Sequence, residues 1–314
     1  MASSASTGVT AASVGPQNQT IGQKFRDFGT FMYNSEEHTV LGRTAKSWGQ
    51  ITLFYAIYYA CLSGFFIALI AVFYQTLDWN FPKLSGPDSL LRQNPGMGFR
   101  PIPDVTTTLV RFVKGDPTSY SPYTDHMEAY LSYYENENQV TDTGVIVDCD
   151  AINGRRPESE WDKACRFDLT QNLGADCVKQ QAFGFDDGLP CILVKLNRIF
   201  DWMPQMYVNG SGSGIPSEIA DMYQNYYVTV KCTGENPADQ DNIGPITYYP
   251  AGGFHYKYFP FRNQQGYRSP LVFVRFERPT PGVLIMVECR AYAANIQYDR
   301  LEHAGSVHFE LMVD

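Results

Sequence analysis

The stretch Ile51–Leu77 reads ITLFYAIYYACLSGFFIALIAVFYQTL. It forms most of a run from Ser47 to Leu77 that contains no Asp, Glu, Lys or Arg. About 20 apolar residues in an α-helix span the roughly 30 Å hydrocarbon core of a bilayer. The chain contains one such run, so the sequence predicts a single transmembrane helix over residues 50–77 and the lipid bilayer as its surroundings.

The cysteines and sequons indicate an orientation. Residues 1–23 contain no apolar signal-peptide core, so we expect the transmembrane segment to serve as signal and anchor together. Cys61 lies within that segment, and the other six cysteines follow it, as is typical of an oxidising compartment. The sequon at Asn209 is on the same side, whereas the sequon at Asn18 precedes the membrane. We therefore expect a cytoplasmic N-terminus, an extracellular C-terminal part and a glycan on Asn209.

The charge is distributed unequally about the membrane segment. Residues 1–77 carry four basic and three acidic residues, which leaves 20 of the 24 basic and 30 of the 33 acidic residues for the part that follows. An acidic domain is repelled by a phosphate backbone, so nucleic acid is not an expected partner.

Composition divides the chain into four segments. Residues 1–49 form the predicted cytoplasmic segment, and its aromatic and charged part from residue 24 onward is expected to lie against the membrane or a partner. Residues 78–104 contain five prolines and three glycines, which predicts an extended stalk without regular secondary structure. The extracellular domain is expected to occupy residues 105–314.

The pattern after residue 105 is that of β-strands. Short segments of alternating apolar residues are separated by proline and glycine turns, which is typical of a β-sandwich. The clearest of them are residues 191–197, 226–232, 271–277 and 283–291. One short helix is expected over residues 124–137.

Six cysteines follow the membrane segment: Cys149, Cys165, Cys177, Cys191, Cys232 and Cys289. They allow fifteen pairings, and spacing alone does not choose among them. Cys232 and Cys289 both end inward-facing alternations, so a bridge between them would staple two strands and contribute about 4 kcal/mol in the chain-entropy model. Bridges Cys149–Cys165 and Cys177–Cys191 would be local and worth about 3 kcal/mol each in the same model.

Two Asp-x-Asp motifs raise the question of catalysis. Asp148–Asp150 and Asp239–Asp241 match the metal-nucleotide motif of type II Golgi glycosyltransferases, which share the predicted topology. No nucleotide-binding pattern surrounds them, so solvated loop acids are the favoured interpretation. The glycine-rich Gly210–Gly214 lacks the lysine and helix of a phosphate loop, and the five histidines show no metal-ligand spacing. We predict no catalytic residue, metal or cofactor.

Three tyrosines stand in the first third of the membrane segment. At about 100° per residue, Tyr55, Tyr58 and Tyr59 fall on one face of the helix. The opposite face carries a groove of small residues, which lets another helix approach closely: Ala60, Gly64 and Ala68. A hydroxyl in an apolar environment usually needs a partner, which favours contact with protein over an aromatic belt at the membrane surface.

The sequence contains the blocks FMYNSEEHTVLGRTAKSWGQI, LFYAIYYACLSG, PGMGFRPIPD, FGFDDGLPCILVKLNRIFDWMP, YYPAGGFHYKYFP and VECRAYAANIQY. Together these blocks resemble the β subunit of sodium/potassium-transporting P-type ATPases. One block departs from the family pattern, because CRFDLTQNLGADCVK has a longer gap between its cysteines and continues with Val178-Lys179 in place of Ser-Gly.

The resemblance implies one membrane span, an immunoglobulin-like β-sandwich with three sequential disulfides, and no catalysis. Such a subunit is expected to stabilise and mature a catalytic α subunit, to deliver it to the plasma membrane and to tune its potassium affinity. Tyr55, Tyr58 and Tyr59 match positions that contact the membrane helices of the α subunit. A small single-span regulatory subunit is a further candidate partner. The β subunit of a proton/potassium ATPase and a type II membrane receptor or ectoenzyme are the alternatives.

Overall fold

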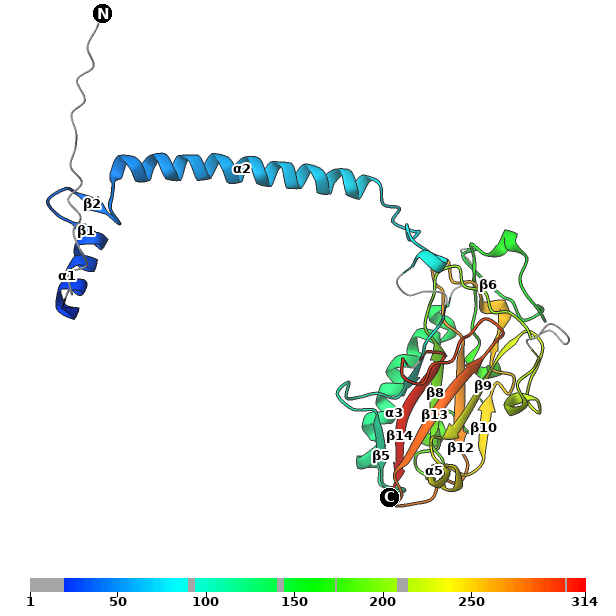
Figure 1. Cartoon of the computed structure of the whole chain (residues 1–314). Coiled ribbons are helices and arrows are strands. Elements are labelled where there is room, and N and C mark those ends of the chain that lie inside the picture. Colours follow the sequence, from blue (N-terminus) through cyan, green and yellow to red (C-terminus); the bar gives the residue numbers. More distant parts are fainter. Residues whose placement is uncertain (1–19, 90–93, 140–143, 173, 208–213, 303) are drawn as a thin grey trace, which may run out of the picture. The chain divides into compact units, whose positions relative to one another are not determined.

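The computed structural model describes residues 20–89, 94–139, 144–172, 174–207, 214–302 and 304–314 (Figure 1). The chain forms two compact units, Met1–Leu77 and Asp78–Asp314.

The first unit contains a long apolar helix preceded by a short helix and a small sheet. Its elements are α1 (Ile21–Met32), β1 (Tyr33–Asn34), β2 (Thr39–Val40), β3 (Arg43–Thr44) and α2 (Ala45–Gln75). The three strands pair antiparallel in sequence order. α2 begins five residues before the predicted span because the Thr44 side chain caps it by accepting a hydrogen bond from the Ser47 N–H at 3.5 Å.

Among the described residues, α2 is the one helix long and apolar enough to cross a membrane. None of its residues is buried within the unit. A 31-residue helix with an exposed apolar surface on every side suits lipid rather than water, so the structure agrees with the predicted transmembrane helix.

The second unit contains two larger sheets. The four-stranded sheet has the order β10 (Ile246–Tyr249), β12 (Leu271–Phe276), β8 (Cys191–Leu196) and β4 (Met97–Arg100), and it is antiparallel throughout. The five-stranded sheet has the order β11 (Phe254–His255), β9 (Tyr227–Gly234), β13 (Ile285–Tyr292), β14 (Ser306–Val313) and β5 (Leu109–Phe112). Only its β14–β5 pair is parallel. Strands β6 (Ile146–Val147) and β7 (Ala164–Cys165) form a small parallel pair.

The two larger sheets share one hydrophobic core. Phe309 of β14 stacks on Phe99 of β4 with ring centroids 4.8 Å apart, and it meets Phe276 of β12 edge-on at 6.2 Å. The inward side chains of both sheets belong to a single buried cluster. The structure thus confirms a mainly β domain, whereas its immunoglobulin-like character stays a prediction.

Strand β4 corrects the predicted stalk. The prediction that residues 78–104 lack regular structure is wrong at Met97–Arg100, which pairs with β8. Met97 and Phe99 are buried, with 7% and 3% of their surfaces exposed. The alternating apolar side chains of this strand enter the core in spite of the surrounding prolines and glycines, so the domain begins before residue 105.

The described part of the second unit has the helices α3 (Pro117–Leu131), α4 (Leu169–Asn172) and α5 (Pro237–Asn242). Figure 1 labels α3 and α5. α3 starts earlier than the expected helix because the Asp116 side chain caps it by accepting the Thr118 N–H at 3.0 Å. The ring of Tyr130 lies 5.6 Å from the Arg100 guanidinium and 5.7 Å from Lys195 Nζ, which places α3 against the four-stranded sheet. Short 3₁₀ turns lie at Gly86–Asp88, Ser132–Tyr134, Asn136–Asn138, Glu158–Glu160, Lys179–Gly184, Ser217–Ile219 and Tyr256–Tyr258.

Candidate interaction site: the aromatic ridge of the membrane helix

Four aromatic rings pack together along one side of α2. Tyr55 stacks on Tyr59 with centroids 6.1 Å apart, and Phe54 stacks on Tyr58 at 6.3 Å. Edge-on contacts at 5.4 Å join Tyr58 to Tyr59 and Phe54 to Tyr55. We name these four residues the aromatic ridge. Because the rings already support one another within the helix, the ridge is a preformed surface.

The ridge is open to its surroundings. Tyr55 and Tyr58 are each 50% exposed, and Tyr59 is 58% exposed. Within the described part of the chain, no hydrogen bond joins the three hydroxyl groups to any other residue. A phenol hydroxyl at membrane depth without a partner loses the hydrogen bonds that water would supply. The ridge therefore presents three hydroxyl groups that have no hydrogen-bond partner among the described residues.

The groove of small residues lies on the other side of α2. A Cβ atom placed on Gly64 would meet no other atom within 4 Å, so this position is open space. Ala60 and Ala68 lie one turn to either side of it along the helix. The groove has room for the backbone of a second helix.

Phe54 is the member of the ridge that the sequence reasoning missed. It stands four residues before Tyr58, the spacing that brings two side chains together on a helix. This i, i+4 spacing is the sequence signal for Phe54, although Phe54 carries no hydroxyl group.

The six cysteines after α2 form three buried disulfides: Cys149–Cys165, Cys177–Cys191 and Cys232–Cys289. Cys232 and Cys289 are directly opposite one another on β9 and β13, which are neighbours in one sheet. Cys165 ends β7, and Cys191 begins β8. Cys61, in the membrane helix, is a free thiol.

The two carboxylates of the first acidic motif, Asp148–Asp150, pair with basic side chains. Asp148 is 3.0 Å from Arg166, and Asp150 is 3.1 Å from Lys257. A hydrogen bond from the Asp150 N–H, together with the charge of Arg166, lowers the pKa of the Asp148 carboxyl. Asp239 is buried in the first turn of α5. Within the described ranges, no three His, Cys, Asp or Glu side chains are arranged to hold a metal ion.

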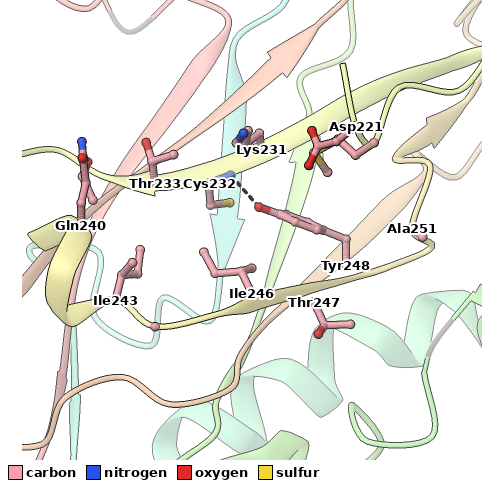
Figure 2. Close-up of a pocket in the computed structure, with 13 residues that line it drawn as sticks. Asp221, Lys231, Cys232, Thr233, Gln240, Ile243, Ile246, Thr247, Tyr248 and Ala251 are labelled. Atoms are coloured by element: carbon pink, nitrogen blue, oxygen red, sulfur yellow. Dashed lines mark hydrogen bonds between the residues drawn. The ribbon is translucent and has the colours of Figure 1, made fainter. Parts of the chain in front are cut away.

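A cavity of about 660 Å³ lies between β9, α5 and β10 (Figure 2). The Tyr248 side chain points across the cavity, and its hydroxyl group accepts a hydrogen bond from the Cys232 N–H at 2.8 Å. Burial raises the pKa of Tyr248 to about 12, so the hydroxyl stays protonated. Asp221 and Lys231 are the only charged residues of the described lining, which holds no histidine. We assign this cavity no chemistry.

The predicted glycosylation site, Asn209, lies outside the described residues, as do the first four residues of Gly210–Gly214.

Within the described residues, one helix could span a membrane, and it is joined in sequence to a disulfide-bonded, mainly β domain. This is the organisation of a single-pass membrane protein. The profile described as "Sodium / potassium ATPase beta chain" matches residues 18–309. The chain therefore belongs to the sodium/potassium ATPase β-chain family.

Relatives cover nearly the whole chain. It is 38% identical over 291 residues to the probable sodium/potassium-transporting ATPase subunit beta-3 of Caenorhabditis briggsae, covering 91% of this chain and 86% of the relative. It is 35% identical to the sodium/potassium-transporting ATPase subunit beta-2 of Drosophila melanogaster, with 93% of each chain covered. The beta-2 subunit of Homo sapiens is 28% identical over 312 residues.

Proposed function

We propose that this chain is a non-catalytic subunit that stabilises and matures the catalytic α subunit of a sodium/potassium-transporting ATPase. It delivers that subunit to the plasma membrane and modulates its potassium affinity. The observation that carries the proposal is the aromatic ridge, whose hydroxyl groups find no partner in the described chain. The family assignment supplies the kind of partner.

The membrane helices of the α subunit are the proposed neighbours of the ridge. Tyr55, Tyr58 and Tyr59 offer both aromatic packing and hydroxyl hydrogen bonds to an adjacent helix. Hydrogen bonds between membrane helices average about 0.6 kcal/mol each. Three such bonds with their ring packing give roughly 1–3 kcal/mol, which is the usual size of a coupling energy between sites.

The proposed orientation has the N-terminus in the cytoplasm and the second unit outside the cell. All three disulfides lie after α2, and disulfides persist in oxidising compartments. The predicted glycan on Asn209 belongs to the same side. The groove around Gly64 is the proposed contact for a small single-span regulatory subunit.

The alternatives have less support. The relatives named above are sodium/potassium-transporting ATPase subunits, which favours that pump over a proton/potassium pump. An ectoenzyme reading of the Asp148–Asp150 motif is weakened because both carboxylates already pair with basic side chains.

Co-purification tests the proposal. The tagged full-length chain, expressed with a candidate α subunit and extracted in mild detergent, should bring down the α subunit together with potassium-dependent ATP hydrolysis. A matched chain in which residues 51–75 are replaced by an unrelated membrane helix should recover less of it. If both chains recover equal amounts with equal potassium dependence, the ridge does not carry the function.

A further inference from the structure

Helix α1 has an apolar face that the described chain leaves uncovered. At about 100° per residue, four of its apolar residues fall within a sector of about 60°. They are Ile21, Phe25, Phe28 and Met32, with exposed fractions of 74%, 72%, 61% and 46%. The opposite side carries Gln23, Arg26 and Thr30. We name the four residues the apolar face of α1.

Contacts within the first unit connect α1 to the start of the membrane helix. The Trp48 indole N–H, in the first turn of α2, donates a hydrogen bond to the Val40 carbonyl at 2.8 Å. The next residue, Leu41, donates its N–H to the Met32 carbonyl at 3.2 Å. Two hydrogen bonds thus join the end of α1 through the β2–β3 turn to the first turn of α2.

The position of Trp48 indicates how deep in the membrane this connection lies. The predominantly apolar part of α2 begins at Ile51, so Trp48 lies just before it. Tryptophan side chains favour this boundary between headgroups and acyl chains. The C-terminal end of α1 is therefore held close to the membrane surface.

Helix α1 also needs a surface to stabilise it. It has 12 residues, and two of them, Gly22 and Gly29, disfavour the helix. Isolated helices of this length are marginal in water and are normally stabilised by packing of an amphipathic face. Gln23 Oε1 accepts the Thr20 N–H at 3.2 Å and defines the start of the helix, but it covers none of the apolar face.

We propose that α1 lies in the plane of the bilayer surface, with its apolar face inserted at the boundary between headgroups and acyl chains. The occupant of the face is the phospholipid in which α2 is embedded. Amphipathic helices with aromatic apolar faces bind lipid surfaces in this way. Lys24, at the edge of the face, has an aliphatic stem that can lie along the apolar surface while its ammonium group reaches the headgroups.

The inference rests on the membrane span of α2 and not on the proposed α subunit, so its test uses the full-length chain alone in phosphatidylcholine vesicles. Nitroxide labels are attached to Phe28→Cys and, separately, to Thr30→Cys, each in a Cys61→Ser background. Accessibility to oxygen, which concentrates in lipid, is compared with accessibility to a water-soluble nickel chelate. We expect the label at position 28 to be accessible to oxygen and shielded from nickel, and the label at position 30 to show the reverse.

A second pair of variants adds the same charge on opposite sides of α1. With the label at position 28, Phe25→Asp should remove the shielding from nickel, whereas Thr30→Asp should leave it unchanged. Equal nickel accessibility at positions 28 and 30 would overturn the proposal. Shielding of position 28 from both reagents would also overturn it, because the face would then lie against protein.

Discussion

His308 of β14 contacts the carboxylate of Glu235, the residue that follows β9. The other ring nitrogen, Nε2, is 2.9 Å from Glu310, and Glu288 lies opposite His308 on β13. Arg300 in turn is 3.1 Å from Glu235. One imidazole therefore connects the end of β9 with β14 on the outer side of the five-stranded sheet.

This arrangement predicts that stability falls at alkaline pH. Burial by itself lowers the pKa of His308, but hydrogen bonds and charge interactions with Glu310 and Glu235 outweigh it and raise the pKa. The stabilisation that these interactions give the folded state is complete below the ordinary histidine pKa of about 6.5 and is lost as the pH rises through the raised pKa of His308. We expect His308→Gln to remove this pH dependence. An ion pair of this kind contributes about 1 kcal/mol to stability. Thermal unfolding of the full-length chain in detergent across pH measures it, with His38→Gln as the control. Identical pH profiles for the parent chain and His308→Gln would contradict the prediction.

Replacing Tyr55, Tyr58 and Tyr59 by leucine should alter pump function without preventing insertion. Leucine keeps the helix hydrophobic, while ring packing and hydroxyl groups are lost. A loss of roughly 1–3 kcal/mol should shift apparent potassium affinity several-fold if the neighbouring helices differ between ion-bound states. Potassium activation of ATPase activity, in membranes matched for α content, checks this, and Ala60→Leu in the groove is the comparison. Unchanged affinity and detergent stability would instead identify the tyrosines as an aromatic belt.

Breaking the Cys232–Cys289 bridge should impair folding of the second unit. The bridge joins neighbouring strands across a sequence separation of 57, and its removal should cost about 4 kcal/mol in the chain-entropy model. Cys232→Ser should be retained in the endoplasmic reticulum and fail to deliver the α subunit, which surface labelling of both chains detects. Normal surface levels with a free thiol at Cys289 would disprove this.

Glycosylation should reveal the orientation. Asn209→Gln is expected to remove the N-glycan, whereas Asn18→Gln should change nothing, because in the proposed orientation only the side after α2 reaches the glycosylation machinery. Gel mobility before and after glycosidase treatment provides the readout. A mobility shift caused by the Asn18 variant would mean that the topology is inverted.

The start of the domain can be tested at Phe99. This ring is 3% exposed and stacks on Phe309, so Phe99→Ala should destabilise the second unit by about 3–5 kcal/mol. Val105→Ala is the matched control, because Val105 is 90% exposed and its truncation should cost less than about 0.5 kcal/mol. Denaturant unfolding of the full-length chain compares the two. Equal stabilities would mean that residues 97–100 are not part of the folded core.

Local patterns in the sequence were sufficient for some elements and not for others. The charge-free run predicted α2, and alternating apolar residues predicted β8, β9, β12 and β13. The parallel pairing of β14 with β5 depends on contacts about 200 residues apart, which no local pattern encodes. β4 was missed because prolines and glycines around it resemble a loop, and α1 because its two glycines weaken the helical signal.

The sequence likewise predicts some features of the candidate site and not others. The shared face of Tyr55, Tyr58 and Tyr59 follows from helix periodicity alone. The sequence does not predict the contacts of Phe54 or the hydrogen bond between Trp48 and Val40. These interactions depend on side-chain rotamers and on the turn that precedes α2. The three hydroxyl groups have no hydrogen-bond partner among the described residues, so the partner proposed for them comes from the family assignment.

The length of α2 also bears on which membranes suit the chain. The apolar part from Ile51 to Phe73 has 23 residues and, at 1.5 Å per residue, is about 35 Å long. The hydrocarbon core measures about 27 Å in the endoplasmic reticulum and about 32–33 Å in the plasma membrane. In the endoplasmic reticulum the helix must tilt strongly or thicken the lipid around it. In the plasma membrane its apolar length nearly equals the thickness of the hydrocarbon core. Hydrophobic mismatch should therefore cost more in the thinner membrane than in the thicker one, by fractions of a kcal/mol per Å.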